Sequence, residues 1–196
     1  MSASFTALSR AVRAYIGQPH RYAHSVRVAR LADRLAQRHG EHAALARRAA
    51  ILHDVARLYD VPRLLAECER RSLPVDAFER RHPIVLHARL GAELARDIFG
   101  ERDERVLQAI RRHTLAAPGM TRLDAILYLA DGLEPGRDFP ERAGLEARAF
   151  ADLDDGMRAV LASSIVYLRG RGLEAAPQTL AALETYTLAE RSSLSA

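Results

Sequence analysis

Six ionisable side chains occupy positions where the sequence predicts the buried side of a helix. His24 is in register with Val28, Leu31 and Leu35, at the four-, three- and four-residue steps of an apolar helical stripe. The other five groups occur in the same way on four further predicted helices: His53 with Asp54, His87, His113 and Asp131. Asp131 is also at a helix C-terminus, where the helix dipole disfavours an anion, and a buried carboxylate needs a partner.

A bound cation accounts for all six groups together, although a single histidine on an apolar face is usually just a core residue. Imidazole and carboxylate ligands without a thiolate are typical of Fe, Mn, Zn, Ni or Co. Four of the side chains would complete the coordination of one ion. All six suit a pair of ions, because Asp54 can bridge them through its two oxygens. Such a pair can hold a hydroxide directed at a phosphorus atom.

The elements that must position these groups are helices. The chain has 196 residues, is 48% hydrophobic and contains only 11 Gly and 8 Pro, while β-branched alternation is nearly absent. Thr121 and Asp124 form the pattern of a capping box at the start of one helix. We expect an all-α fold in which residues 1–196 form one compact, bundle-like domain. The helices are expected at 4–16, 19–40, 42–58, 62–71, 84–98, 103–113 and 122–131, with two or three more within 141–190.

Composition excludes several classes of protein. The single cysteine, Cys68, allows neither an internal disulfide nor a cysteine-based metal site. No apolar run approaches the roughly 20 residues that span a bilayer, and no signal-peptide core is present, so we expect a cytoplasmic protein without membrane contact. The chain has no lysine, and its arginines are mixed evenly with 25 acidic residues. This pattern argues against a nucleic-acid-binding module and suits an anionic small molecule.

The order His24, His53-Asp54 and Asp131 resembles the HD superfamily of metal-dependent phosphohydrolases. With His87 and His113 it looks like the dinuclear, YqeK-type branch of that superfamily. The resembling segments span roughly residues 20 to 186 and include "HRYAHSVRVARLA", "AAILHDVAR", "PGMTRLDAILYLADGLEPGRDFP" and "APQTLAALETY". The resemblance implies an HD-domain helical bundle with a di-iron or similar centre. It also implies that a metal-bound hydroxide cleaves diadenosine tetraphosphate into two molecules of ADP.

The resemblance also assigns roles to individual residues. Arg21, on the same helical face as His24, and Arg137 match positions that hold the nucleotide phosphates and act in catalysis with Asp54. The remaining substrate-binding matches are Ile84, Val85, Leu86, His87, His113 and Thr179. The metal positions match His24, His53, Asp54, His87, His113 and Asp131. A metal-binding core at about 18–135 would then be closed at the nucleotide site by helices within 141–190.

Three departures from the family pattern concern the surroundings of the site. Arg57 stands where the family usually has lysine, Leu86 replaces a common aromatic residue, and the loop after His113 reads "TLAAPGM" instead of a form like "TSGRPGM". Rival hypotheses are another HD nucleotidase, a di-iron HD oxygenase, and a regulatory protein that binds nucleotide without turnover. The native metal (iron, or Mn, Co, Ni or Zn), the number of ions, the cleavage position and the oligomeric state, including a homodimer, stay open at this point.

Overall fold

The computed structural model describes residues 4–194, with side chains to residue 188, and this part of the chain contains helices and no strand. The predicted all-α fold is therefore confirmed. The helices are α1 (Phe5–Ile16), α2 (Pro19–Arg38), α3 (Ala43–Leu52), α4 (Val61–Arg70), α5 (Ala77–Arg81), the 3-10 turn η1 (Pro83–Val85), α6 (Leu86–Phe99), α7 (Glu104–Arg112), α8 (Arg122–Leu133), α9 (Arg142–Ala151), α10 (Leu153–Gly170) and α11 (Pro177–Leu194).

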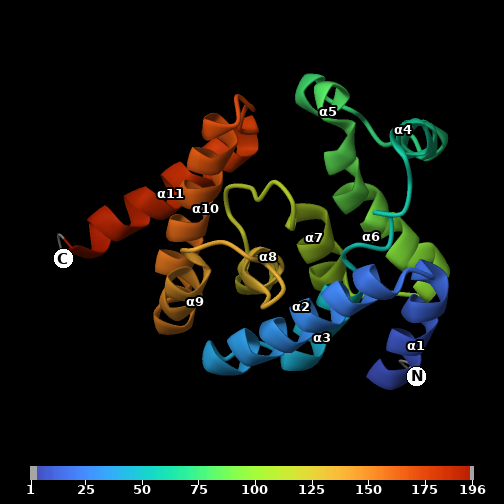
Figure 1. The fold of residues 1–196 in the computed structure, drawn as a ribbon, viewed down its shortest axis with the longest axis horizontal. Coiled ribbons are helices and arrows are strands. Elements are labelled where there is room, and N and C mark those ends of the chain that lie inside the picture. Colours follow the sequence, from blue (N-terminus) through green and yellow to red (C-terminus); the bar gives the residue numbers. More distant parts are fainter. Residues whose placement is uncertain (1–3, 195–196) are drawn as a thin grey trace.

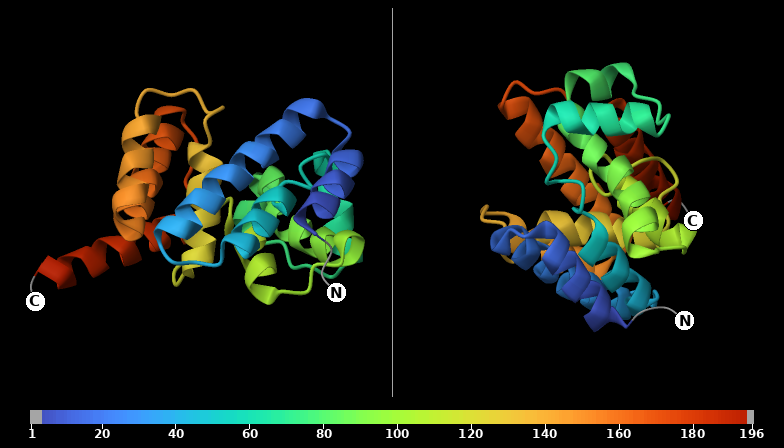
Figure 2. Two further views of the ribbon diagram at one scale, coloured as in Figure 1. Left: turned by 90° about the horizontal axis from the view of Figure 1, so that it is seen from below. Right: turned by 90° about the vertical axis from the view of Figure 1, so that its right-hand side faces the viewer.

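Helix α8 lies at the centre of the arrangement (Figure 1). It packs against α2, α3 and α7 on one side and against α9 and α10 on the other. Nine of its twelve residues are buried, because it is apolar around nearly its whole circumference. Helix α11 packs on α10, and its C-terminal end projects away from the rest of the molecule (Figure 2). The core is made largely of leucine and alanine side chains from both sides of α8.

Local sequence signals explain where several helices begin and end. The predicted capping box of α8 is present, since Thr121 Oγ1 accepts from the Asp124 amide and the Asp124 carboxylate accepts from the Thr121 amide. Gly100 ends α6 with φ at 68°, a left-handed conformation that costs glycine no steric strain. The two or three helices expected within 141–190 are the three helices α9, α10 and α11, of which α11 continues to Leu194. No helix within residues 4–194 is long and apolar enough to cross a membrane.

One predicted helix is shorter than expected. The pattern indicated a helix over 42–58, but α3 ends at Leu52 and residues 53–59 form tight turns. The Nδ1 atom of His53 lies 2.7 Å from the carbonyl oxygen of Ala50. In a continuing helix that carbonyl would accept from the Asp54 amide. The imidazole therefore takes the place of the next helical hydrogen bond, and His53 and Asp54 leave the helix direction at this point.

Candidate metal centre

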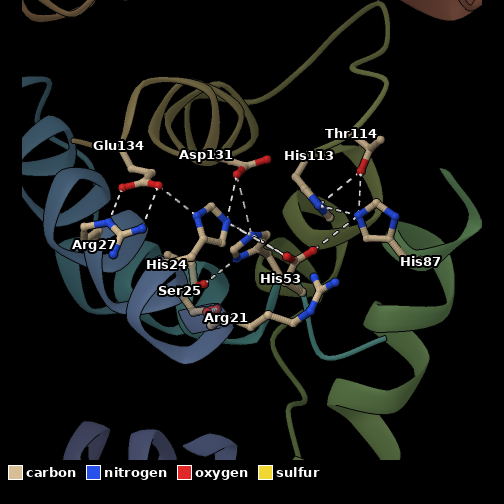
Figure 3. Close-up of polar contacts among 12 residues, drawn as sticks. Arg21, His24, Ser25, Arg27, His53, His87, His113, Thr114, Asp131 and Glu134 are labelled. Atoms are coloured by element: carbon tan, nitrogen blue, oxygen red, sulfur yellow. Dashed lines mark hydrogen bonds and ion pairs between the residues drawn. The ribbon is translucent and has the colours of Figure 1, made fainter. Parts of the chain in front are cut away.

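The six predicted ligands converge on one point in the fold. Figure 3 shows the four imidazoles and the Asp131 carboxylate turned toward one another from separate elements. His24 comes from the second turn of α2 and Asp131 from the last turn of α8, while His53 and His113 directly follow α3 and α7. His87 is the second residue of α6.

The first half of the cluster lies between α2, α3 and α8. The Nε2 atom of His24 lies 3.3 Å from Nε2 of His53 and 3.1 Å from Oδ1 of Asp131. Nε2 of His53 is 3.8 Å from the same oxygen of Asp131. The nearest ligand atoms of these three residues lie within 4.8 Å of one another, a spacing that could hold one metal ion.

The second half is formed where α6 meets the end of α7. Nε2 of His87 lies 3.2 Å from Nε2 of His113. The Thr114 hydroxyl lies 3.2 Å and 3.1 Å from these two nitrogens, respectively. Helix α6 also approaches the backbone of His53 closely, because Gly91 has no side chain and a Cβ there would lie 3.2 Å from the His53 carbonyl oxygen.

Asp54 lies between the two halves and faces both. Its Oδ2 is 3.9 Å from Nε2 of His53 and 4.0 Å from Nε2 of His24. Its Oδ1 is 3.4 Å from Nε2 of His87, and His53, Asp54 and His113 form a second group with metal-ligand spacing. One carboxylate thus has an oxygen directed to each half, as a residue bridging two cations requires.

Hydrogen bonds on the outer nitrogens fix how the imidazoles are presented. Nδ1 of His53, His87 and His113 lies 2.7, 2.5 and 2.7 Å from the carbonyl oxygen three residues earlier in the chain. Since a carbonyl only accepts, Nδ1 carries the proton in each ring and Nε2 presents a lone pair. Two such acceptors 3.2 Å apart, as in His87 and His113, repel each other unless a cation lies between them. The donor set therefore fits a metal pair.

Electrostatics keep the second half neutral. Burial, reinforced by His53 and His87, lowers the pKa of His113 to about 3, and burial also lowers the pKa of His87. Both rings are consequently uncharged near neutral pH and free to bind a metal. Although burial works in the opposite direction, the neighbouring imidazoles hold the pKa of Asp54 below its ordinary value.

Charge on the first half is set by carboxylates. Burial opposes ionisation of Asp131, but the hydrogen bond to His24 and the nearby imidazoles hold the pKa of Asp131 well below its usual range. Asp131 and Glu134 raise the pKa of His24 although burial lowers it. Two carboxylates with lowered pKa values, Asp131 and Glu134, therefore lie beside His24.

Glu134 and Thr114 are site residues that the sequence reasoning left without a role. Oε1 of Glu134 lies 3.1 Å from Nδ1 of His24, on the side of the ring away from the cluster. The sequence gives only a weak indication that these two residues belong to the site, because Glu134 is part of the "EPGR" run and Thr114 follows His113.

The two predicted phosphate-binding arginines differ in position. Arg137 Nη2 donates to Oδ1 of Asp131 at 2.8 Å, and its side chain remains 46% exposed. Arg21 lies one turn before His24, but its Nε donates to Oε1 of Gln18 at 2.9 Å rather than to any of the six ligands. Arg137 is thus part of the cluster in this structure, whereas Arg21 lies beside it.

The predicted nucleotide-contacting stretch before His87 is only partly accessible. Ile84 is 37% exposed and Val85 is half-buried, but Leu86 is completely buried in the core. Leu86 therefore supports the position of His87 from the core, and its contact with a nucleotide stays a prediction from the resemblance. Thr179 is also buried, and its hydroxyl donates to the carbonyl of Leu115 at 2.6 Å.

A pocket of about 280 Å³ opens beside the second half of the cluster. Besides metal-cluster residues, Thr114 and Arg137, its wall includes Arg57, Tyr128 and Ser164. Helices α8 and α10 thus supply the wall opposite His87. This volume lies near the lower end of the roughly 300–1,000 Å³ found for small-molecule sites.

Comparisons with known proteins agree with this geometry. Residues 21–136 match the family model described as HD domain. The chain is 34% identical over 160 residues to the symmetrical bis(5'-nucleosyl)-tetraphosphatase of Bacillus subtilis (strain 168), covering 82% of this chain and 86% of the relative. A protein of the same description from Halalkalibacterium halodurans is 34% identical over 177 residues, covering 88% and 91% of the two chains.

A solved structure is similar over nearly the whole molecule. It is the crystal structure of a predicted HD superfamily hydrolase involved in NAD metabolism from Clostridium acetobutylicum. The match has a TM-score of 0.89 at 29% sequence identity and covers 95% of this chain and 98% of that one. The similarity includes the C-terminal helices as well as the part that carries the cluster.

Proposed function

The chain belongs to the HD domain family, and from that membership we propose that it is a metal-dependent hydrolase that cleaves diadenosine tetraphosphate into two ADP. The observation that carries the proposal is the position of Asp54 between two imidazole clusters, with one oxygen facing each. Relatives that match over more than four fifths of the chain and are named symmetrical bis(5'-nucleosyl)-tetraphosphatase support the substrate class.

The ligands proposed for the metal are the six converging side chains: His24, His53, Asp54, His87, His113 and Asp131. A divalent metal pair bound there would supply Lewis-acid activation of water, so that hydroxide is available near neutral pH. The protein contributes imidazoles whose Nε2 atoms already face the cluster, and burial lowers the pKa of two of them, His87 and His113. It also shields the ligands from bulk water, since His53, His87 and His113 are all buried.

Hydrolysis adds water across the bridge between the two inner phosphates. The water oxygen bonds to one inner phosphorus, the bond from that phosphorus to the bridging oxygen breaks, and ADP leaves with that oxygen. Arg137 and Arg57 line the pocket beside the cluster and offset the negative charge of the phosphates. Thr114 places its hydroxyl between His87 and His113, where it can donate to a phosphate oxygen. We place Arg21 at the edge of this site, where release from Gln18 would let its guanidinium reach a phosphate.

The pocket size suits one half of the substrate. About 280 Å³ accommodates phosphates next to the cluster and leaves the second nucleoside outside. Ile84 and Val85 belong to η1 and are at least partly exposed, and we propose that a nucleoside lies against them. Thr179 anchors the loop after His113 and so shapes the pocket from the side of α11.

Chromatography of the products, paired with elemental analysis of the purified protein, tests the proposal. We expect about two transition-metal ions per chain and ADP as the sole nucleotide product of diadenosine tetraphosphate. ATP with AMP as products would contradict symmetrical cleavage. Oxygen consumption without phosphoanhydride cleavage would favour the di-iron oxygenase hypothesis, and release of phosphate from nucleoside monophosphates would favour a nucleotidase.

The proposal also includes the identity of the metal, the domain organisation, the location and the partners of the protein. We propose iron as the native metal, because the resemblance to the dinuclear HD branch implies a di-iron or similar centre, and the thiolate-free donor set suits Mn, Co, Ni or Zn as alternatives. The single-domain organisation over 1–196, the cytoplasmic location, the lack of a nucleic-acid partner and a homodimer remain predictions from the sequence. Size-exclusion chromatography with light scattering tests the last of these directly.

A further inference from the structure

Glu134 is a buried carboxylate that contacts a proposed metal ligand from behind. Its side chain is 2% exposed, and Oε1 lies 3.1 Å from Nδ1 of His24. Since a deprotonated carboxylate only accepts, Nδ1 of His24 donates to Glu134, which leaves Nε2, the atom nearest to His53 and Asp131, as the nitrogen that could bind a cation. Glu134 is neither in the wall of the pocket nor in the groups with metal-ligand spacing. It can therefore influence the proposed metal centre only through His24.

Three donors besides His24 hold this carboxylate in place. Arg27 donates from Nη2 to Oε1 at 3.1 Å and from Nε to Oε2. The Gly136 amide donates to Oε2 at 2.6 Å. A Cβ at position 136 would lie 2.4 Å from Nη2 of Arg27, so the guanidinium lies directly against the glycine backbone. The carboxylate is therefore locked between α2 and the loop after α8.

His24 is the exception among the four histidines of the cluster. Carbonyl oxygens of Ala50, Ile84 and Ile110 accept from the Nδ1 atoms of the other three rings. Only His24 is backed by a full negative charge. A carboxylate behind an imidazole makes the opposite nitrogen a stronger donor to a cation, and loss of such a partner typically costs about 10–100-fold in metal affinity.

We propose that Glu134 is a positioning residue for His24, and that it makes the half of the centre formed by His24, His53 and Asp131 the tighter of the two cation sites. This inference rests on the proposed metal centre. The Arg27 pair and the Gly136 amide hold Glu134 in one rotamer, so the imidazole of His24 keeps one tautomer and one direction in the absence of substrate.

The test measures metal retention rather than activity. The protein loaded with Mn²⁺ is dialysed against increasing chelator, and the manganese left per chain is determined by elemental analysis. Wild type is expected to lose its two ions in two separate steps. In Glu134→Gln the more strongly held ion is expected to leave at about 10–100-fold lower chelator concentration, while the weaker step stays in place.

Glu101 provides a matched control. It is also 2% exposed, pairs with Arg48 at 2.5 Å, and accepts at 2.8 Å from each of the Arg102 and Asp103 amides. Among the described residues, Glu101 makes no hydrogen bond or ion pair with an imidazole, so Glu101→Gln removes a buried, arginine-paired charge without changing a contact of the cluster. We expect that variant to lose thermal stability but to keep the wild-type chelation curve.

The outcomes separate this inference from the proposed function. If the wild-type protein retains no manganese at any chelator concentration, both the proposed metal centre and this inference are contradicted. Two ions in wild type with identical chelation curves for Glu134→Gln and Glu101→Gln would overturn only the role of Glu134. Should Glu134→Gln not fold, Arg27→Gln keeps the carboxylate but removes two of its donors. Earlier loss of the stronger ion in that variant supports the proposal, and an unchanged curve overturns it.

Discussion

Thr179, at the start of α11, donates its hydroxyl hydrogen to the carbonyl of Leu115 at 2.6 Å. Leu115 belongs to the loop that directly follows His113 and Thr114, so this one bond connects the C-terminal helix to the wall of the metal cluster. Thr179 is only 5% exposed, and Leu115 is half-buried. The resemblance assigns Thr179 to nucleotide binding, and the structure adds that the same residue holds the loop.

Thr179→Val should raise KM for diadenosine tetraphosphate while leaving the metal content unchanged. The substitution keeps the shape of the side chain but leaves the Leu115 carbonyl without its donor, at a cost of about 1–3 kcal/mol. Steady-state kinetics and elemental analysis on the same preparations measure both quantities. Thr185→Val on the exposed side of α11 removes a hydroxyl that bonds only to Ala181 of its own helix, and it should leave KM unchanged. Equal kinetics in the two variants would contradict the connection.

The same loop contains a residue in an unusual backbone conformation. Ala116 has φ at 56°, the left-handed region that costs a residue with a Cβ about 1–2 kcal/mol. It occupies the third position of "TLAAPGM", where the related pattern "TSGRPGM" has glycine. Ala116 is also 4% exposed, so its methyl group contributes to the core.

Ala116→Gly should therefore be almost neutral for stability. Relief of the left-handed strain offsets the lost methyl burial of about 0.8 kcal/mol and the added chain entropy of about 0.5–1 kcal/mol. Ala109→Gly, at a fully buried helical position of α7, loses the methyl without any strain relief and should cost about 1–2 kcal/mol more. Urea unfolding of the two variants measures the difference, and equal destabilisation would show that the strain at Ala116 is unimportant.

The convergence of the six ligands was predictable because helical periodicity places residues on one face without knowledge of the tertiary fold. His24, His87 and Asp131 lie within helices, and their positions in the apolar stripes of α2, α6 and α8 were sufficient. His53 and His113 follow the last residues of α3 and α7, so the periodicity pointed to them although they cap rather than extend those helices.

The surroundings of the ligands were not predictable in the same way. Glu134 is charged and follows a helix in a run that contains Gly and Pro, and such a run is typical of an exposed loop. Its burial depends on Arg27, which is 107 residues away in the sequence, and on the close approach at Gly136. The burial of Leu86 was also not predictable, because the resemblance to a family motif does not indicate which side of the first turn of α6 faces the core.

Asp54→Ala should abolish both metal binding and hydrolysis while leaving helical content nearly intact. The carboxylate supplies an oxygen to each half of the cluster, and removing it leaves the four imidazoles without their central anion. Circular dichroism, elemental analysis and product chromatography give the three readouts. Asp33→Ala, which removes the partner of Arg47 on the outer side of α2, is the control and should retain metal. Hydrolysis at the wild-type rate by Asp54→Ala would refute the ligand assignment.

Arg137→Ala should lower kcat/KM by roughly 10²–10³, the range observed when one preorganised donor to developing charge is removed. The guanidinium is held on Oδ1 of Asp131 at 2.8 Å and faces the pocket with about half of its surface exposed. Arg137→Lys should recover only part of the loss, since an ammonium cannot reproduce the planar fork. Arg105→Ala, an exposed arginine paired with Asp103, serves as the control for loss of one positive charge. An unchanged kcat/KM in Arg137→Ala would remove this residue from the site.

The metal-free protein should lose stability as the pH falls from about 6.5 toward 3. The pKa of His113 is about 3 in the folded protein because of burial, against 6.5 for an unperturbed histidine. Between these values the unfolded chain binds the proton and the folded protein does not, so acid favours unfolding. From pH 7 to pH 5 this residue alone should cost on the order of 2 kcal/mol. The lowered pKa values of His87, Asp54 and Asp131 act in the same direction, each toward lower pH.

His24 acts in the opposite sense, because its raised pKa gives stability that is complete below 6.5 and is lost as the pH rises through the folded value. Urea unfolding of the chelator-treated protein at pH 7 and pH 5 gives the net difference. His113→Gln should make that difference smaller by about the contribution of His113, since glutamine has no proton to gain. His42→Gln, at an exposed histidine before α3, should retain the full wild-type difference. An unaltered pH dependence in His113→Gln would mean that the imidazole takes up its proton at the same pH in the folded protein as in the unfolded chain, which would contradict the lowered pKa of His113.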